Sequence, residues 1–408
     1  MEYLYALYLL SGFIKSFLIF WHLNLKIDLT LIFAIFLTLG MIIHIWGSKL
    51  YNLSLKRMFS FEALILFYSW MIFSLIYGIS PEYCYIKTFL FLTNILAFMI
   101  PLFYKGFNIE KFLKFFVILE TIIGLIFLYY FPKIYSLPSS ETLKSFEGIY
   151  LGSSEISGLC LIILFCKRLY KKSLYFLLII LNLAILVLAG GRGPLIFTLL
   201  VLLFLYIFLF VKWLKKGKVK KYLVYNILLG CSLIISVSIA IYILFPKTHF
   251  LLERSLSRMS YIIEFIKGST NYDYSIEARE YHLRFSINQI MQNATSFLFG
   301  YGIGSYGMLY SGYDERGYPH NIILEIWVEL GLIGVILFIF FLLSTFKNNI
   351  KFENPFFWVI LFLFFNALKS SSLVDLRVMF GFLAMFMVYG DYLNYQEMLK
   401  YRFGENDG

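Results

Sequence analysis

Long apolar runs, separated by short polar segments, dominate the hydrophobic pattern of this chain. A run of about 20 apolar residues is long enough to cross a bilayer as a helix. The pattern predicts about twelve such spans, and the fold class expected is therefore an all-α polytopic membrane protein. We place the spans at 3–22, 28–47, 60–79, 84–104, 112–131, 151–167, 173–190, 194–212, 222–245, 321–344, 354–369 and 373–392.

Composition agrees with a membrane setting. Apolar residues make up 61% of the chain and charged residues only 14%, whereas soluble domains average about 25% charged residues. The net charge of +11 does not indicate a nucleic-acid partner, because the Lys and Arg residues cluster in short loops between apolar runs. The four cysteines show no metal-type spacing, so we interpret them as small core residues and predict no metal or cofactor.

The basic loops also predict an orientation. Every second loop is rich in Lys and Arg, which favours cytoplasmic N- and C-termini by the positive-inside rule. No basic residue precedes Lys15, so the first span is expected to be retained rather than cleaved as a signal peptide. The predicted division is a bundle of about nine spans at 1–245, an outer loop at 246–320, about three spans at 321–392 and a cytoplasmic tail at 393–408.

The outer loop, at about 75 residues, is too long to be a simple connector. Two stretches of it have apolar residues at helical spacing, which predicts two amphipathic helices lying over the membrane domain. Arg279, His282 and Ser286 share the polar face of the second helix. The two apolar stripes are Leu252, Leu256, Met259, Ile263 and Ile266, and then Ile276, Leu283, Ile287, Ile290 and Met291.

The stretch 299–334 joins this loop to an apolar helix. Four glycines within eight positions predict a tight turn or a close backbone approach, namely Gly300, Gly302, Gly304 and Gly307. Tyr318 and His320 follow, and Asn321 is expected to cap a helix that begins there. Glu325 and Glu329 then share one face of that helix.

His320 is a candidate general base, because an imidazole titrates near neutrality. The other four histidines, His282 among them, have no such context and are expected at interfaces or on the surface. Arg192 lies in a Gly-Gly-Arg-Gly-Pro hairpin between two spans, where its fork of donors suits a phosphate. The alternative is that Arg192 is a positioning charge at the membrane rim.

Arg279 is also a candidate for anion binding, although an isolated loop arginine is usually a solvated surface charge. Arg254, Arg258 and Arg284 have the same two interpretations, and together they give the outer loop an unusually basic character. Glu155 is an acid at the end of a span and therefore a functional candidate. The alternative for Glu155 is a salt bridge with a nearby arginine.

Three of these motifs resemble the O-antigen ligase and O-antigen polymerase superfamily. The glycine turn at 300–307 leading to the His-Asn-Ile-Ile-Leu-Glu helix of 320–334 resembles that family's C-terminal signature. The hairpin at 190–194 resembles its small-Arg-Gly motif, and Ala278-Arg279 resembles its Arg-bearing helix. The resemblance covers about 185–340. Where the family often has an Asn before an earlier span, this chain has Ser153-Ser154-Glu155.

The resemblance implies a GT-C-like, metal-independent, inverting glycosyltransferase of the bacterial cytoplasmic membrane. Its donor would be an undecaprenyl-diphosphate-linked glycan, with Arg192 and Arg279 holding the diphosphate and His320 activating the acceptor. The acceptor would be a glycan, in a polymerase, or a lipid A core sugar, in a ligase. A polymerase would also imply a chain-length regulator as partner.

Two other functions stay open. A peptidoglycan-type glycan polymerase shares the large outer loop but is expected to have an acidic catalytic residue there. A flippase or lipid-linked oligosaccharide transporter would more often show charged or broken helices near the membrane midplane and two similar halves. Here the charges that could serve a site concentrate at the outer face, where there is one large asymmetric loop, and this favours the glycosyltransferase.

Overall fold

The computed structural model describes residues 1–20, 28–47, 55–135, 140–215, 274–347 and 350–403. Within these ranges every element is a helix, which confirms the all-α class. Five helices there are long and apolar enough to cross a membrane, at Arg57–Ile76, Tyr83–Phe103, Ile109–Tyr130, Arg192–Lys212 and Ile322–Phe346. The total of about twelve spans stays a prediction, and the expected span at 222–245 lies outside the described residues.

The chain forms two compact units that interleave in sequence. One unit contains residues 2–33 and 108–273. In this unit α6 packs against α5, α7 and α8, and α1 packs against α5. Its helices are α1 (Glu2–Phe20), the start of α2 (Leu29–Gly47), α5 (Ile109–Tyr135), α6 (Ser140–Cys166), α7 (Lys172–Leu188) and α8 (Arg192–Lys215).

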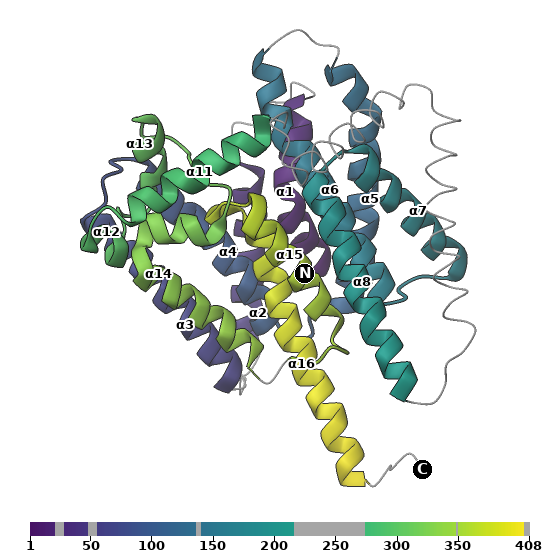
Figure 1. The fold of residues 1–408 in the computed structure, drawn as a ribbon. Coiled ribbons are helices and arrows are strands. Elements are labelled where there is room, and N and C mark those ends of the chain that lie inside the picture. The colour runs from purple at the N-terminus through teal and green to yellow at the C-terminus, as the bar shows by residue number, and fades with distance from the viewer. Residues whose placement is uncertain (21–27, 48–54, 136–139, 216–273, 348–349, 404–408) are drawn as a thin grey trace. The chain divides into compact units, whose positions relative to one another are not determined.

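The other unit contains Met1 and residues 34–107 and 274–408. Figure 1 shows α14 alongside α3, and α4 packs along α16. The elements of this unit after α2 are α3 (Leu55–Phe73), η1 (Ser74–Ile76), α4 (Tyr83–Phe103), α11 (Tyr274–Ile290), α12 (Ala294–Phe299), α13 (Ser305–Ser311), α14 (Ile322–Phe346), α15 (Pro355–Ser370), η3 (Leu373–Asp375) and α16 (Arg377–Phe403).

Aromatic rings fill the core between these helices. Phe341 of α14 stacks on Phe380 of α16 with ring centroids 5.3 Å apart, and Phe98 of α4 meets Phe341 edge-on at 5.3 Å. Such pairs contribute about 0.5–1.5 kcal/mol beyond the area they bury. The helix α16 runs on to Phe403, so much of the segment expected as a polar tail is helical.

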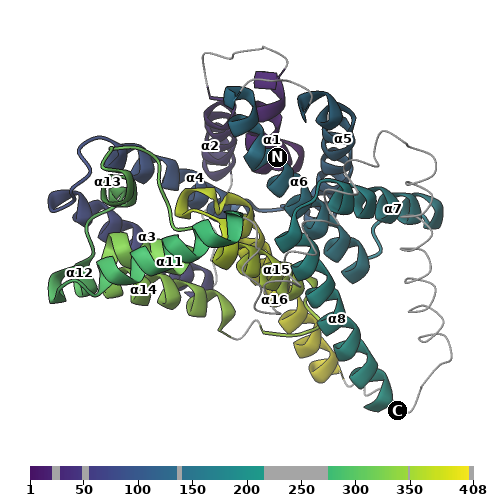
Figure 2. The same cartoon turned by 45° about the horizontal axis from the view of Figure 1, so that its top comes forward.

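The second of the two helices predicted between residues 246 and 320 is present as α11, which Figure 2 shows alongside α14. The first predicted helix, at 252–266, lies outside the described residues, together with Arg254 and Arg258. On α11, Ser286 and Ile290 are buried, whereas Leu283 and Ile287 are exposed, as is Met291 just after the helix. The polar face of α11 therefore turns toward the protein, and most of its described apolar stripe turns away.

Candidate functional site

The glycine turn at 300–307 packs against a break in α14. The helix is interrupted at Gly331, whose φ of 67° is not helical. A break leaves carbonyl groups without their intrahelical donors. Here the backbone N–H groups of Tyr301 and Gly302 donate to the carbonyls of Val328 and Glu329 at 2.9 and 2.8 Å, and the indole of Trp70 donates to Leu330 at 3.0 Å. The turn and the Trp70 indole thus donate to carbonyl groups at the break.

Two positions in this contact require glycine. Gly300 has a φ of 73°, and a Cβ there would lie 2.5 Å from the carbonyl carbon of Glu329. A Cβ at Gly331 would lie 2.2 Å from the carbonyl oxygen of Leu298. Both atoms belong to the backbone, so neither contact can be relieved by a rotamer change. The predicted close approach is confirmed, whereas the break in α14 was not expected.

His320 stands directly before the capped end of α14. Asn321 accepts hydrogen bonds from the backbone N–H groups of Ile323 and Leu324 at 3.0 and 3.1 Å, which confirms the predicted cap. His320 has a φ of 56°, and it alone among the described non-glycine residues has a positive φ. Strained backbone of this kind persists where the surroundings impose it, and it gathers at functional sites.

A cluster of rings from α11, α13 and the 312–320 loop surrounds His320. The rings of Tyr318 and His282 lie 4.6 and 5.4 Å from it. His282 shares a hydrogen bond of 2.8 Å between its Nδ1 and the hydroxyl of Tyr306, and stacks on Tyr310 at 4.4 Å. The sequence placed His282 only at an interface or on the surface, and it did not predict these contacts. The sequence did contain a signal for a role of His282 in this cluster, because His282 lies on the same helical face as Arg279.

Burial, together with smaller contributions from the nearby His282 and Arg279, lowers the pKa of His320 to about 4. Burial also lowers the pKa of His282. Both rings are consequently uncharged at neutral pH, so each keeps one nitrogen lone pair. The His320 ring also lies within hydrogen-bonding reach of the backbone of Ser370, at the end of α15.

Arg279 belongs to this cluster. It lies partly buried on α11, and its charge acts on both His320 and Tyr318. Burial raises the pKa of Tyr318 to about 12, with the nearby Asp375 adding to the rise, so its hydroxyl keeps its proton at neutral pH. The structure thus brings together two of the sequence-predicted candidates, Arg279 and His320.

Arg192 begins α8 in the other unit, after a turn at Gly190 with a φ of 77°. The backbone N–H of Gly191 donates to the hydroxyl of Ser154 at 3.1 Å, and a Cβ on Gly191 would lie 2.6 Å from that side chain. The hairpin therefore packs directly on α6 at the residue before Glu155. Two of the sequence candidates, Arg192 and Glu155, thus sit on neighbouring segments of one unit.

For the remaining described arginine candidate, Arg284, the structure favours a solvated surface charge over anion binding. Its side chain is 75% exposed and pairs with Glu280 one helical turn away at 2.6 Å. An exposed pair of this kind contributes about 0–1 kcal/mol. Arg284 is thus a surface charge in this unit.

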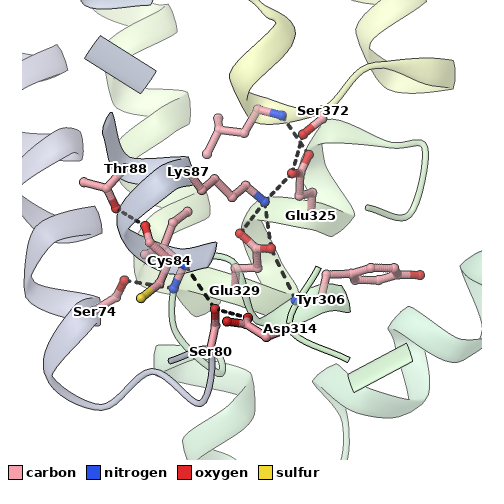
Figure 3. A network of polar contacts seen from close by, with 12 residues as sticks. Ser74, Ser80, Cys84, Lys87, Thr88, Tyr306, Asp314, Glu325, Glu329 and Ser372 are labelled. Carbon is pink, nitrogen blue, oxygen red and sulfur yellow. Dashed lines mark hydrogen bonds and ion pairs between the residues drawn. The ribbon is translucent and has the colours of Figure 1, made fainter. Parts of the chain in front are cut away.

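A buried charge cluster joins α4 to α14 next to the glycine turn. The sequence did not predict this cluster. Lys87 of α4 donates to Glu325 at 2.5 Å and to both oxygens of Glu329 at 2.7 Å, as Figure 3 shows. All three side chains are at most 1% exposed. Glu325 also accepts from the Ser372 hydroxyl at 2.7 Å and from the Leu373 N–H at 2.8 Å.

The loop before His320 is fastened to the start of α4. The carboxylate of Asp314 accepts from Ser80 at 2.5 Å and from the backbone N–H groups of Glu82 and Tyr83 at 2.7 and 3.0 Å. Although burial opposes its ionisation, these bonds hold the pKa of Asp314 below its usual value. On the other side, Arg316 pairs with Asp375 at 2.6 Å. The site loop thus has two polar anchors.

Across the described ranges, no three His, Cys, Asp or Glu side chains gather as a metal site would need. The chemistry of the cluster around His320 is that of a neutral imidazole, a guanidinium and several phenols.

A known protein family matches the part of the chain that contains this cluster. The sequence model of the O-antigen ligase family matches residues 176–339. This region belongs to the O-antigen ligase and polymerase superfamily. The match contains Arg192, Arg279 and His320, and the resemblance drawn from the motifs is thereby confirmed. The family supports an enzyme of glycosyltransferase type that acts on lipid-linked glycans in a membrane. No curated protein matches the chain.

Proposed function

We propose that this protein moves a glycan from an undecaprenyl-diphosphate-linked donor to an acceptor hydroxyl at the outer face of the bacterial cytoplasmic membrane. The observation that carries the proposal is a half-buried His320 with a positive φ, on which the charge of Arg279 acts, inside the region that matches the O-antigen ligase family. The reaction would need no metal and would invert the anomeric centre.

In this reaction His320 is the general base. Its free ring nitrogen takes the proton of the acceptor hydroxyl while that oxygen forms a bond to the anomeric carbon. The bond from the anomeric carbon to the phosphate oxygen breaks, and the diphosphate leaves with the electron pair. A pKa of about 4 keeps the ring unprotonated before substrate binds. The bound diphosphate raises that pKa through its negative charge and so strengthens the base during turnover.

Arg279 is proposed to hold the diphosphate, since its charge already acts at His320. A guanidinium offers planar paired donors that match phosphate oxygens, and fixed donors stabilise the charge that develops on a leaving group. Arg192 joins the proposal through the family motif of its hairpin. It belongs to the other unit, so its role rests on that resemblance.

The acceptor defines the subclass. A second lipid-linked repeat as acceptor makes the protein a polymerase, with a chain-length regulator as partner, and a lipid A core sugar makes it a ligase. Both place the glycine turn and His320 on the outer side, with the two termini in the cytoplasm. Tyr318 and Asn321 then orient His320 from either side, and Glu155 is an accessory residue near the Arg192 hairpin.

A transporter of lipid-linked glycans is the second candidate. The break at Gly331 lies within a helix long and apolar enough to span the membrane, and broken spans are common in transporters. The two functions differ in whether a covalent product forms. Transport needs two compartments, whereas transfer proceeds in detergent micelles.

The test is a transfer assay with the purified full chain in detergent, supplied with a lipid-linked donor and with each acceptor class in turn. We expect a new glycosidic product with one acceptor class in the presence of a chelator. Arg279→Lys is expected to impair transfer, because an ammonium cannot reproduce the planar fork. Arg284→Lys is the matched control on the same helix. No product with either acceptor, together with donor translocation in vesicles, would favour the transporter.

A further inference from the structure

The buried cluster of Lys87, Glu325 and Glu329 is costly to form. Taking charges out of water is offset only when the geometry is excellent and the remaining lone pairs are satisfied, and apolar residues of similar size are often as stable. Stability alone is therefore a weak reason for this cluster. The hydrogen bonds from the cluster to other segments indicate its role. Glu325 accepts from Ser372 and Leu373, and Glu329 lies next to the backbone N–H of Tyr306, so each carboxylate contacts a segment next to the His320 cluster.

Glu325 holds the segment that supports His320 itself. It accepts hydrogen bonds from the Ser372 hydroxyl and the Leu373 N–H, while Asn94 of α4 donates to the Leu373 carbonyl at 2.8 Å. Two residues earlier, Ser370 ends α15, where the last carbonyl groups of a helix lack intrahelical donors. The His320 ring lies within hydrogen-bonding reach of the Ser370 backbone. A ring N–H fixed to a carbonyl leaves the other nitrogen as the lone-pair bearer.

Glu329 holds the segment that supports His282. The backbone N–H of Tyr306 lies 3.4 Å from Glu329 Oε1, and the Gly304 backbone is also within reach of that carboxylate. The Tyr306 hydroxyl in turn meets His282 Nδ1. Figure 3 shows Lys87 bonded to both carboxylates. One ammonium therefore joins the segments that support the two imidazoles.

We infer that Lys87, Glu325 and Ser372 are positioning residues, which orient the His320 ring and fix its tautomer through the Ser370–Leu373 segment. The inference rests on the proposed function only for its kinetic consequence. The rings of His282 on α11 and Tyr318 in its own loop contact His320, and the charge of Arg279 on α11 acts on it. The Ser372 hydroxyl donates to Glu325.

Ser372→Ala is the test substitution, because it removes one hydrogen bond to Glu325 and leaves Lys87 paired. Ser344→Ala is the matched control, since Ser344 is equally buried in the same unit, near the other end of α14, and donates to the Phe341 carbonyl at 2.6 Å. We expect Ser372→Ala to lower kcat about 10- to 100-fold, as small misplacements of catalytic groups do, with an unchanged KM for the donor. Ser372→Thr, which keeps the hydroxyl, is expected to restore kcat.

A second readout is independent of activity. In full-length protein labelled with ¹⁵N-histidine, the ring signals of His320 are assigned by their loss in His320→Ala and followed over a pH titration. Wild type and Ser344→Ala are expected to show one tautomer and a pKa below the ordinary value. Ser372→Ala is expected to show mixed tautomers and a higher pKa. Wild-type ring signals and titration in Ser372→Ala would overturn the inference, whereas wild-type transfer by His320→Ala would overturn only the proposed function.

Discussion

The rings of His282 and His320 meet edge-on, with centroids 5.4 Å apart and planes at 75°. One ring comes from α11 and the other from the loop before α14, so this contact joins the two elements that carry the family motifs. Burial lowers the pKa of both rings, and the nearby His282 adds to the lowering at His320. The pair is therefore neutral in the range where a surface histidine begins to ionise.

The pH dependence of transfer follows from this. Burial, His282 and Arg279 lower the pKa of His320 to about 4, so the base form dominates above that pH and is lost as pH falls through it. We expect the acid limb of kcat/KM, which reports the free enzyme, to lie well below pH 6.5. The profile is measured in buffers of constant ionic strength. An acid limb of kcat/KM at pH 6.5 or above would mean that His320 is solvated or is not the base.

Removal of Lys87 should be strongly destabilising. Lys87→Met leaves two carboxylates buried without their cation, and breaking a buried pair in this way costs about 3–5 kcal/mol. The control is Lys114→Met, which breaks a half-exposed pair with Glu110 and should change the free energy of unfolding by less than about 1 kcal/mol. Both are compared by denaturant unfolding in one detergent. Equal losses in the two variants would contradict the buried geometry.

Gly331→Ala tests the break in α14. Alanine at a positive φ costs about 1–2 kcal/mol by itself, and here its Cβ would also lie 2.2 Å from the Leu298 carbonyl oxygen. Gly106 has a φ of 78° with no atom near the Cβ position, so Gly106→Ala isolates the backbone cost. We expect Gly331→Ala to lower the thermal midpoint clearly more than Gly106→Ala does. A smaller effect at Gly331 would show that the turn and the helix do not meet there.

Local signals in the sequence predicted much of this site. Glycine spacing predicted the close approach at 300–307, and the Asn321 cap predicted where α14 begins, because turns and caps depend on neighbouring residues. The pairing of Lys87 with Glu325 spans 238 positions, and no local spacing encodes such a contact. The break at Gly331 was hidden for another reason. It lies inside an apolar run, and a glycine there is compatible with an unbroken membrane helix.

The predicted orientation has its own test. The alternation of basic loops places Asn271 outside and Gly217 inside. In a background without the four native cysteines, Asn271→Cys should react with an impermeant thiol reagent in intact cells, and Gly217→Cys should react only after lysis. Labelling in the reverse order would place the glycine turn and His320 in the cytoplasm and remove the outer-face reaction with them.

The most direct test of the account is donor turnover by purified His320→Gln, measured beside wild type and His320→Ala. Glutamine keeps a hydrogen bond but accepts no proton, and a positioned base contributes about 10²–10⁴-fold. We predict that both variants insert, fold and bind the lipid-linked donor like wild type, and that both transfer the glycan about 10²-fold or more slowly. Near wild-type turnover by His320→Gln would contradict the account, because His320 would then orient the acceptor without taking its proton.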